Sequence, residues 1–169
     1  MLWVHDVSSY YEDVQAIRNV HLKVSPKEIV SIVGSNVAGK TTLINLISGI
    51  LRCTSGEVQF SEERVDLLPP HEIVNRGIVQ IPEGRLLFPE LTVKENLDLG
   101  AYPLRARPTR LETLKKVFDL FPRLEERQGQ ISGSLSGGEQ QMLAIARGDG
   151  PIPCSSCWTN SLLAWHPSW

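Results

Sequence analysis

The segment Gly34–Thr41 reads Gly-Ser-Asn-Val-Ala-Gly-Lys-Thr and satisfies the phosphate-loop pattern GxxxxGK[ST]. A compact β-branched run at 29–33 precedes it and predicts a buried parallel strand. The apolar spacing of 41–47 predicts a helix that Gly49 ends. In this order the three elements form a cradle of backbone N–H groups for phosphate, so the loop predicts an α/β fold.

Each loop residue has an expected part in this phosphate site. Lys40 is expected to reach the β- and γ-phosphates of ATP, and the Thr41 hydroxyl is expected to bind Mg²⁺. The alternative is a glycine turn that only joins strand to helix. Val37 is β-branched and resists the positive φ that such loops use, so weak or absent nucleotide binding is an open hypothesis. The nucleotide-binding candidates in the loop are Gly34, Ser35, Asn36, Val37, Ala38, Gly39, Lys40, Thr41 and Thr42.

Length and composition are those of one soluble globular domain. The chain has 169 residues, 41% of them hydrophobic, and a net charge of −2, which gives no basic footprint for nucleic acid. No apolar run approaches the roughly 20 residues that cross a bilayer, and no signal peptide opens the chain, so a cytoplasmic location is expected. Periodicity predicts further strands at 2–7, 20–24 and 57–60, and helices at 71–76, 93–99, 111–121 and 139–147.

A second motif, Leu-Ser-Gly-Gly-Glu-Gln-Gln at 135–141, lies downstream of the phosphate loop. Alone, it is a polar turn that opens a helix, with Ser136 as the N-cap. Behind a phosphate loop, it indicates the second half of a composite ATP site. A P-loop kinase would have no use for it.

With both motifs present, residues 2–147 resemble the ATP-binding subunits of ABC transporters. The segments 69–74, 81–85, 88–97 and 129–147 are similar to the branched-chain amino acid importer subfamily. The resemblance implies a P-loop ABC nucleotide-binding domain with an antiparallel β subdomain and a helical subdomain at about 88–140. It also implies ATP and Mg²⁺ as ligands.

The resemblance also implies roles for single residues. Tyr11 falls where an aromatic ring stacks on adenine, although a packed strand-end tyrosine is the alternative. Glu83 occupies the Q-loop position, near Mg²⁺ and the transmembrane contact, whereas Gln80 is interpreted as part of a strand.

The 135–141 motif would contact ATP held by an opposite subunit. Ser136, Gly137, Gly138 and Glu139 form this half-site by similarity, through a hydroxyl and backbone amides at a helix start. Such a shared site implies a dimer with a second ATP-binding subunit, together with integral-membrane permease subunits. The subunit would then lie peripherally on the inner face of the cell membrane.

The resemblance ends after Arg147. The family's Walker B strand with its Asp-Glu pair is not readable, and His166 lies in a Trp/Pro tail that does not fit a switch histidine. Read one base earlier, the codons of 157–167 permit Leu-Asp-Glu and then Gly-Leu-Ala-Pro, with one position failing. We therefore interpret 1–147 as a partial domain, incomplete at its C-terminus, and 148–169 as an out-of-frame tail.

Three functional hypotheses follow. The first is an ATP-binding subunit of a branched-chain amino acid importer that lacks Walker B and is hydrolysis-deficient. The second is a non-functional or regulatory fragment. The third is an ABC ATPase of another system, such as lipopolysaccharide export. Loss of the Walker B strand also predicts an open apolar strand edge beside the phosphate-loop strand, and poor solubility.

Overall fold

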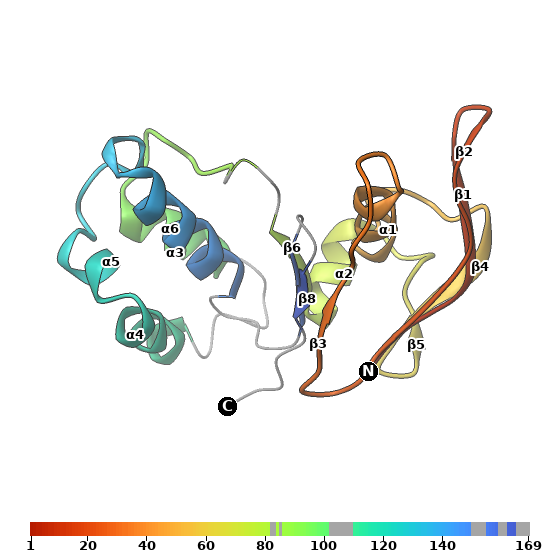
Figure 1. Ribbon diagram of the computed structural model, residues 1–169. Helices are drawn as coiled ribbons and strands as arrows, with labels where there is room; N and C mark the ends of the chain where they lie inside the picture. The colour runs from red at the N-terminus through yellow and green to blue at the C-terminus, as the bar shows by residue number, and fades with distance from the viewer. Residues whose placement is uncertain (82–83, 85, 102–109, 150–154, 159–161, 165–169) are drawn as a thin grey trace. The chain divides into compact units, whose positions relative to one another are not determined.

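The chain folds into two compact units (Figure 1). The computed structural model describes residues 1–81, 84, 86–101, 110–149, 155–158 and 162–164. The first unit holds Met1–Gln80 together with two tail strands, and the second begins at Ile81. The predicted bounds of the helical subdomain, about 88–140, stay a prediction.

An antiparallel sheet forms one side of the first unit. Its strands are β1 (Leu2–Tyr11), β2 (Val14–Val24), β4 (Ser55–Phe60) and β5 (Glu63–Arg64), in the order β2-β1-β4-β5. Leu2 and Val4 point into the core at 3% and 0% exposure, while Trp3 between them is 38% exposed. This alternation is the period of two that predicted a half-buried strand.

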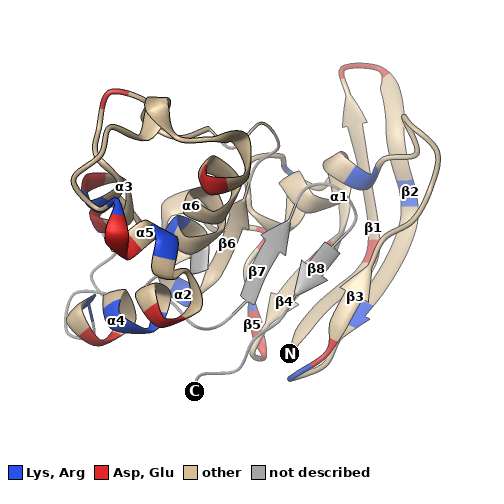
Figure 2. Ribbon diagram, turned by 60° about the vertical axis from the view of Figure 1, so that its left-hand side comes forward, with Lys and Arg blue, Asp and Glu red and all other residues tan. Residues whose placement is uncertain are grey.

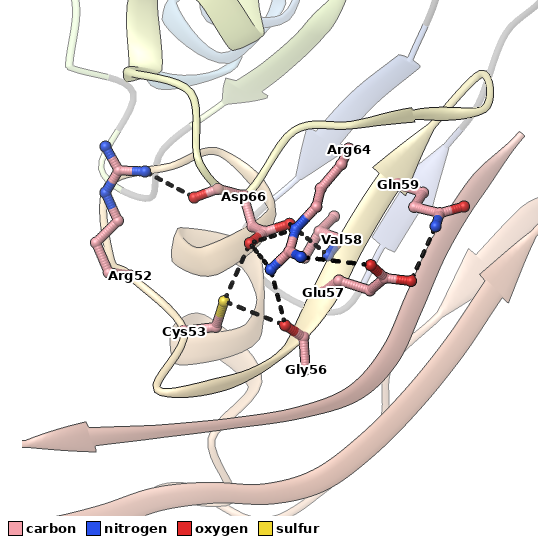
Figure 3. A network of polar contacts seen from close by, with 8 residues as sticks. All are labelled: Arg52, Cys53, Gly56, Glu57, Val58, Gln59, Arg64 and Asp66. Atoms are coloured by element: carbon pink, nitrogen blue, oxygen red, sulfur yellow. Dashed lines mark hydrogen bonds and ion pairs between the residues drawn. The ribbon is translucent and has the colours of Figure 1, made fainter.

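A buried carboxylate fastens the β4–β5 end of this sheet (Figure 3). The Asp66 side chain is 2% exposed and accepts hydrogen bonds from the Arg64 guanidinium at 3.0 Å and from the Val58 backbone N–H at 3.0 Å. Arg52 Nη1 donates to the Asp66 carbonyl oxygen at 2.7 Å, and Cys53 Sγ lies 3.5 Å from Oδ2. Burial alone would raise the pKa of Asp66, but these Arg64 and Val58 contacts outweigh it and hold the pKa below its ordinary value.

A second sheet carries the phosphate loop. Its strands are β3 (Ile29–Ser31), β8 (Leu162–Ala164), β7 (Ser155–Trp158) and β6 (Ile78–Ile81), in the order β3-β8-β7-β6. Helices α1 (Lys40–Ile47) and α2 (Pro70–Arg76) belong to the same unit, and Ile44, Ile47 and Ile73 are almost wholly buried in its core.

The tail corrects one expectation. The phosphate-loop strand was expected to keep an open edge; instead β8 pairs antiparallel with β3, with Ile29 opposite Ala164. The physical reason is that an unpaired strand edge offers backbone groups that any extended segment can satisfy, whatever its side-chain pattern. Pairing does not cover the apolar surface, because Ile29 and Val33 remain 68% and 87% exposed.

The second unit is helical. It comprises α3 (Val93–Gly100), α4 (Arg110–Leu120), α5 (Pro122–Glu126), a 3₁₀ turn η1 (Ser132–Ser134) and α6 (Gly137–Asp149). Val93, Leu97, Leu124 and Leu143 form its core. Figure 2 shows acidic and basic residues interspersed on α4 and α5, where Lys116 and Glu112 pair at 3.0 Å. Within the described part of the chain, no helix is long and apolar enough to cross a membrane.

Candidate functional site

The phosphate loop begins after β3 and ends at the first residue of α1. The Lys40 ammonium donates to the carbonyl oxygens of Gly34 at 2.9 Å and Ser35 at 2.8 Å, so it lies across the mouth of the loop. An ammonium has three donors, and these two bonds leave one for a phosphate oxygen. The Ala38 N–H donates to the Ser35 carbonyl at 3.2 Å, which closes the loop as a tight turn.

Gly39 is the position in the loop where packing requires a glycine. It is the N-cap of α1 with a φ of 85°, a conformation that residues with a Cβ resist. A Cβ placed there would lie 2.4 Å from Ile17 Cγ2 and 3.0 Å from the Ala16 carbonyl oxygen. Strand β2 therefore sets how closely the loop can approach the sheet.

Val37 adopts the positive φ that the sequence argument anticipated. Its φ is 70°, and its side chain is fully exposed. A β-branched residue in the left-handed region costs about 1–2 kcal/mol. Because no packing contact of an exposed side chain offsets that cost, the loop holds strain at the place where it must bind an anion.

Replacing Val37 by glycine is therefore expected to tighten mant-ATP binding by up to about fivefold, since about 1 kcal/mol of strain is removed. Fluorescence titration of mant-ATP measures the effect. Val14→Gly is the matched control, because Val14 is also exposed (71%) but has no positive φ. Equal affinities of Val37→Gly and the parent chain would show that the loop carries no strain relevant to binding.

The remaining loop positions are open to solvent. Ser35, Asn36, Ala38 and Thr41 are exposed, whereas Thr42 is 7% exposed and belongs to the packed face of α1. The Thr41 hydroxyl is thus free to reach a cation. Glu83, the second expected Mg²⁺ contact, lies outside the described residues.

Tyr11 lies at the end of the β1–β2 hairpin. It pairs with Val14 in a ladder that also pairs Ser9 with Ile17, the residue that approaches Gly39. Tyr11 is two residues beyond Ser9 on β1, so at about 3.3 Å per residue it lies about 7 Å along the strand from the point opposite Ile17. Its side chain is 49% exposed, so its ring is available for stacking.

A polar contact that the sequence did not predict ties β6 to the loop helix. Gln80, correctly interpreted as strand, accepts from Ser48 Oγ at 2.6 Å and donates to Asn45 Oδ1 at 3.0 Å. Both partners are on the C-terminal half of α1 or at its end. Nothing in the spacing of these polar residues distinguishes them from surface residues, so only the fold could find the contact.

The 135–141 motif starts α6 with a reciprocal cap. The Ser136 hydroxyl and backbone N–H donate to Glu139 Oε2 at 2.7 and 2.9 Å, and Glu139 N–H donates back to Ser136 Oγ at 3.4 Å. Arg127 Nε lies 3.1 Å from Glu139 Oε1. Leu135 is 6% exposed and anchors the turn, while the following three residues are exposed.

Gly138 faces open space. A Cβ added there would meet no atom within 4 Å, and its φ is not in the left-handed region. The chain's own packing therefore does not require glycine at this position. A surface that must accept a close external group does require it.

Glu139 makes the start of α6 sensitive to acid. Hydrogen bonds from Ser136, helped by the charge of Arg127, hold the pKa of Glu139 below its ordinary value. Its stabilising contribution is thus complete above the unfolded pKa of about 4.3 and is lost as pH falls through the lower folded pKa. Glu139→Gln is expected to flatten the loss of the unfolding midpoint between about pH 5 and 3, measured by circular dichroism. Glu112→Gln, in an exposed pair, is the control; an equally steep acid loss in Glu139→Gln would contradict the assignment.

Comparison with known proteins agrees with this geometry. The profile of the ABC transporter family matches residues 17–148, and the chain belongs to that family. It is 42% identical over 87% of its length to the high-affinity branched-chain amino acid transport ATP-binding protein BraG of Pseudomonas aeruginosa, covering 63% of that protein. It is 33% identical over 86% of its length to the probable branched-chain amino acid transport ATP-binding protein LivF of Archaeoglobus fulgidus, covering 61% of it.

Solved structures give the same assignment. A nucleotide-free ATP-binding cassette from an ABC transporter superposes with a TM-score of 0.75 at 27% identity, over 89% of this chain and 65% of that one. A dimeric bacterial ABC transporter cassette superposes with a TM-score of 0.70 at 30% identity, over 88% of this chain and 68% of that one. The predicted fold class is thus confirmed. The chain spans about three fifths of the length of the curated relatives it matches.

Proposed function

We propose that this chain binds ATP as the nucleotide-binding subunit of an ABC importer for branched-chain amino acids. The observation that carries the proposal is the left-handed Gly39 cap against Ile17, which shapes a loop of mostly exposed residues across which the Lys40 ammonium lies. The 42% identity to a branched-chain amino acid transport protein supports the substrate class.

In this function each loop residue has one task. Backbone N–H groups at the start of α1 bind the phosphates, because a helix N-terminus favours anions. Lys40 donates its remaining hydrogen to a phosphate oxygen and neutralises part of the phosphate charge. The Tyr11 ring stacks on the adenine. Thr41, together with Glu83, would hold Mg²⁺, which when bound neutralises charge on the phosphates.

The second half-site is the signature clamp, by which we mean Ser136, Gly137 and Gly138 with the capping carboxylate of Glu139. Its exposure and the open side of Gly138 fit a phosphate group presented by another subunit. Because the phosphate loop and the signature clamp would bind the same ATP from different subunits, we infer a head-to-tail dimer of ATP-binding subunits. Permease subunits in the membrane would place the dimer on its inner face.

Hydrolysis needs a carboxylate that positions the attacking water. Residues 148–169 contain no Asp-Glu pair of the kind that a Walker B strand supplies. We therefore expect this chain to bind ATP without turning it over above background, and a purified sample that hydrolysed ATP would contradict this part of the proposal.

A mant-ATP titration tests the binding half of the proposal. Lys40→Ala is expected to weaken binding by about 10- to 100-fold, the value of one or two charge-assisted hydrogen bonds. Lys115→Ala removes the same charge from an exposed helical position and is the control. Equal affinities of the two variants would refute the phosphate-loop assignment.

Association and transport are tested separately. ATP is expected to drive dimer formation in sedimentation velocity, and Gly138→Asp is expected to abolish it by placing a carboxylate beside the phosphate. Leucine uptake in a bacterial strain with an intact importer then tests the substrate class, because a subunit that binds ATP without hydrolysing it is expected to lower that uptake when it is overproduced. Dimer formation without ATP dependence would overturn the clamp, whereas lowered uptake of a different solute with leucine uptake unchanged would overturn only the substrate.

A further inference from the structure

Asn96 of α3 has a fully buried polar side chain that forms hydrogen bonds with the backbone of Phe88. It is 0% exposed, its Oδ1 accepts from the Phe88 N–H at 3.0 Å, and its Nδ2 donates to the Phe88 carbonyl at 3.1 Å. Nδ2 also lies 3.0 Å from the Thr92 carbonyl. A buried amide is stable only when its donors and acceptor are satisfied, so Phe88 has one permitted backbone position here.

Ser132 closes this contact into a ring. Its side chain is 0% exposed, accepts from Asn96 Nδ2 at 3.1 Å, and donates to the Phe88 carbonyl at 2.8 Å. Its backbone N–H donates to the Leu91 carbonyl at 2.9 Å. Three segments, 86–91, α3 and η1, are thus joined through two buried side chains.

The same serine fixes the start of α6. The Leu135 N–H donates to the Ser132 carbonyl at 3.3 Å, and Gln140 Nε2 lies 3.3 Å from that oxygen. Leu135 directly precedes the signature clamp and is buried. A shift of Ser132 would therefore also move Leu135, the residue that precedes the signature clamp.

Arg147, near the C-terminal end of α6, also contacts segment 86–91. Arg147 Nη2 donates to the Leu86 carbonyl at 2.8 Å, and the guanidinium lies over the Phe88 ring at 5.5 Å. A cation over an aromatic face is attractive by about 0.5–2 kcal/mol. The Phe88 backbone is therefore held by Asn96 and Ser132, and its ring is held by Arg147 near the C-terminal end of α6.

We propose that the Asn96–Ser132 pair is a positioning device that makes the signature clamp move together with segment 86–91, which follows the Q-loop position. The inference rests on the proposed function for the clamp's role, but not for the coupling itself. Asn96 and Ser132 touch no nucleotide in this scheme. They act by fixing the position of Leu135 relative to Phe88.

Amide hydrogen exchange of the full chain tests the coupling without any ligand. Asn96→Ala removes the acceptor of the Phe88 N–H together with the donor to several backbone carbonyls and risks unfolding, so the milder Ser132→Ala is the primary variant. Exchange is expected to accelerate about tenfold in both 86–91 and 135–140, the effect of losing one buried hydrogen bond. Val117→Ala, buried in the same unit at 6% exposure, is the control and is expected to leave these two segments unchanged relative to their neighbours. Acceleration in only one segment, or in both variants alike, overturns the proposal.

Nucleotide measurements separate this inference from the proposed function. Ser132→Ala is expected to keep the parent affinity for mant-ATP while ATP-driven dimerisation weakens about tenfold, because only the clamp is displaced. A dimerisation loss shared by Val117→Ala would assign the effect to general stability and overturn the positioning role. A parent chain that binds no mant-ATP would refute the proposed function, and the exchange result would still decide the coupling.

Discussion

Asp66→Ala is expected to lower the free energy of unfolding by about 2–4 kcal/mol. The carboxylate is 2% exposed and supplies the acceptor for the Val58 N–H and the Arg64 guanidinium (Figure 3). Its removal leaves a buried backbone donor without a partner. The Arg64 side chain is 45% exposed and rehydrates, which keeps the effect below that of a wholly buried ion pair. Urea unfolding followed by circular dichroism measures the change.

Two comparisons sharpen this expectation. Glu112→Ala removes an exposed carboxylate whose partner is Lys116 and is expected to leave the urea midpoint essentially unchanged. Asp66→Asn keeps the shape and removes the charge. Because the folded pKa of Asp66 is lowered, its contribution is complete above the ordinary pKa and is lost as pH falls, so Asp66→Asn should cost less as the solution becomes acidic. A constant difference between pH 7 and 3 would contradict that reading.

Gly39→Val is expected to weaken mant-ATP binding by about 30-fold or more. The substitution places a Cβ in a backbone with φ of 85°, 2.4 Å from Ile17 Cγ2 and 3.0 Å from the Ala16 carbonyl. The left-handed conformation costs about 1–2 kcal/mol and overpacking against β2 costs about 1–3 kcal/mol. The free loop relieves both by leaving the anion-binding geometry, so binding must restore the strain.

Gly84→Ala separates conformational strain from collision with the sheet. Gly84 also has a positive φ, of 76°, but an added Cβ there meets no atom within 4 Å. It is expected to lower thermal stability slightly and to leave mant-ATP affinity intact. If Gly39→Val bound mant-ATP as tightly as Gly84→Ala, the packing of the loop on β2 would have no part in nucleotide binding.

Local patterns predicted the elements that carry the phosphate loop and the second motif. The run at 29–33 and the spacing at 41–47 correspond to β3 and α1, because strand and helix periods are properties of neighbouring side chains. The prediction that this strand is buried and parallel was wrong, because β3 pairs antiparallel with β8 and Ile29 is 68% exposed. The Ser136–Glu139 cap is equally local, being set within one helical turn. Gln80 was placed in a strand for the same reason.

Contacts between distant segments were beyond these patterns. Asp66 and Asn96 are ordinary polar residues in sequence, and only the meeting of separate elements buries them. The pairing of β8 with β3 is another case, because backbone hydrogen bonds do not depend on the hydrophobic pattern used to judge the tail. The strain at Val37, in contrast, could be predicted from sequence, because the resistance to positive φ is a property of its own β-branched side chain.

The surface of the phosphate-loop strand has a practical consequence. Ile29 and Val33 are 68% and 87% exposed although β8 pairs with β3. Exposed nonpolar residues favour binding to other proteins when they lie together on one surface. Co-expression with a subunit that covers this face should therefore raise the yield of monodisperse material more than any change in the tail.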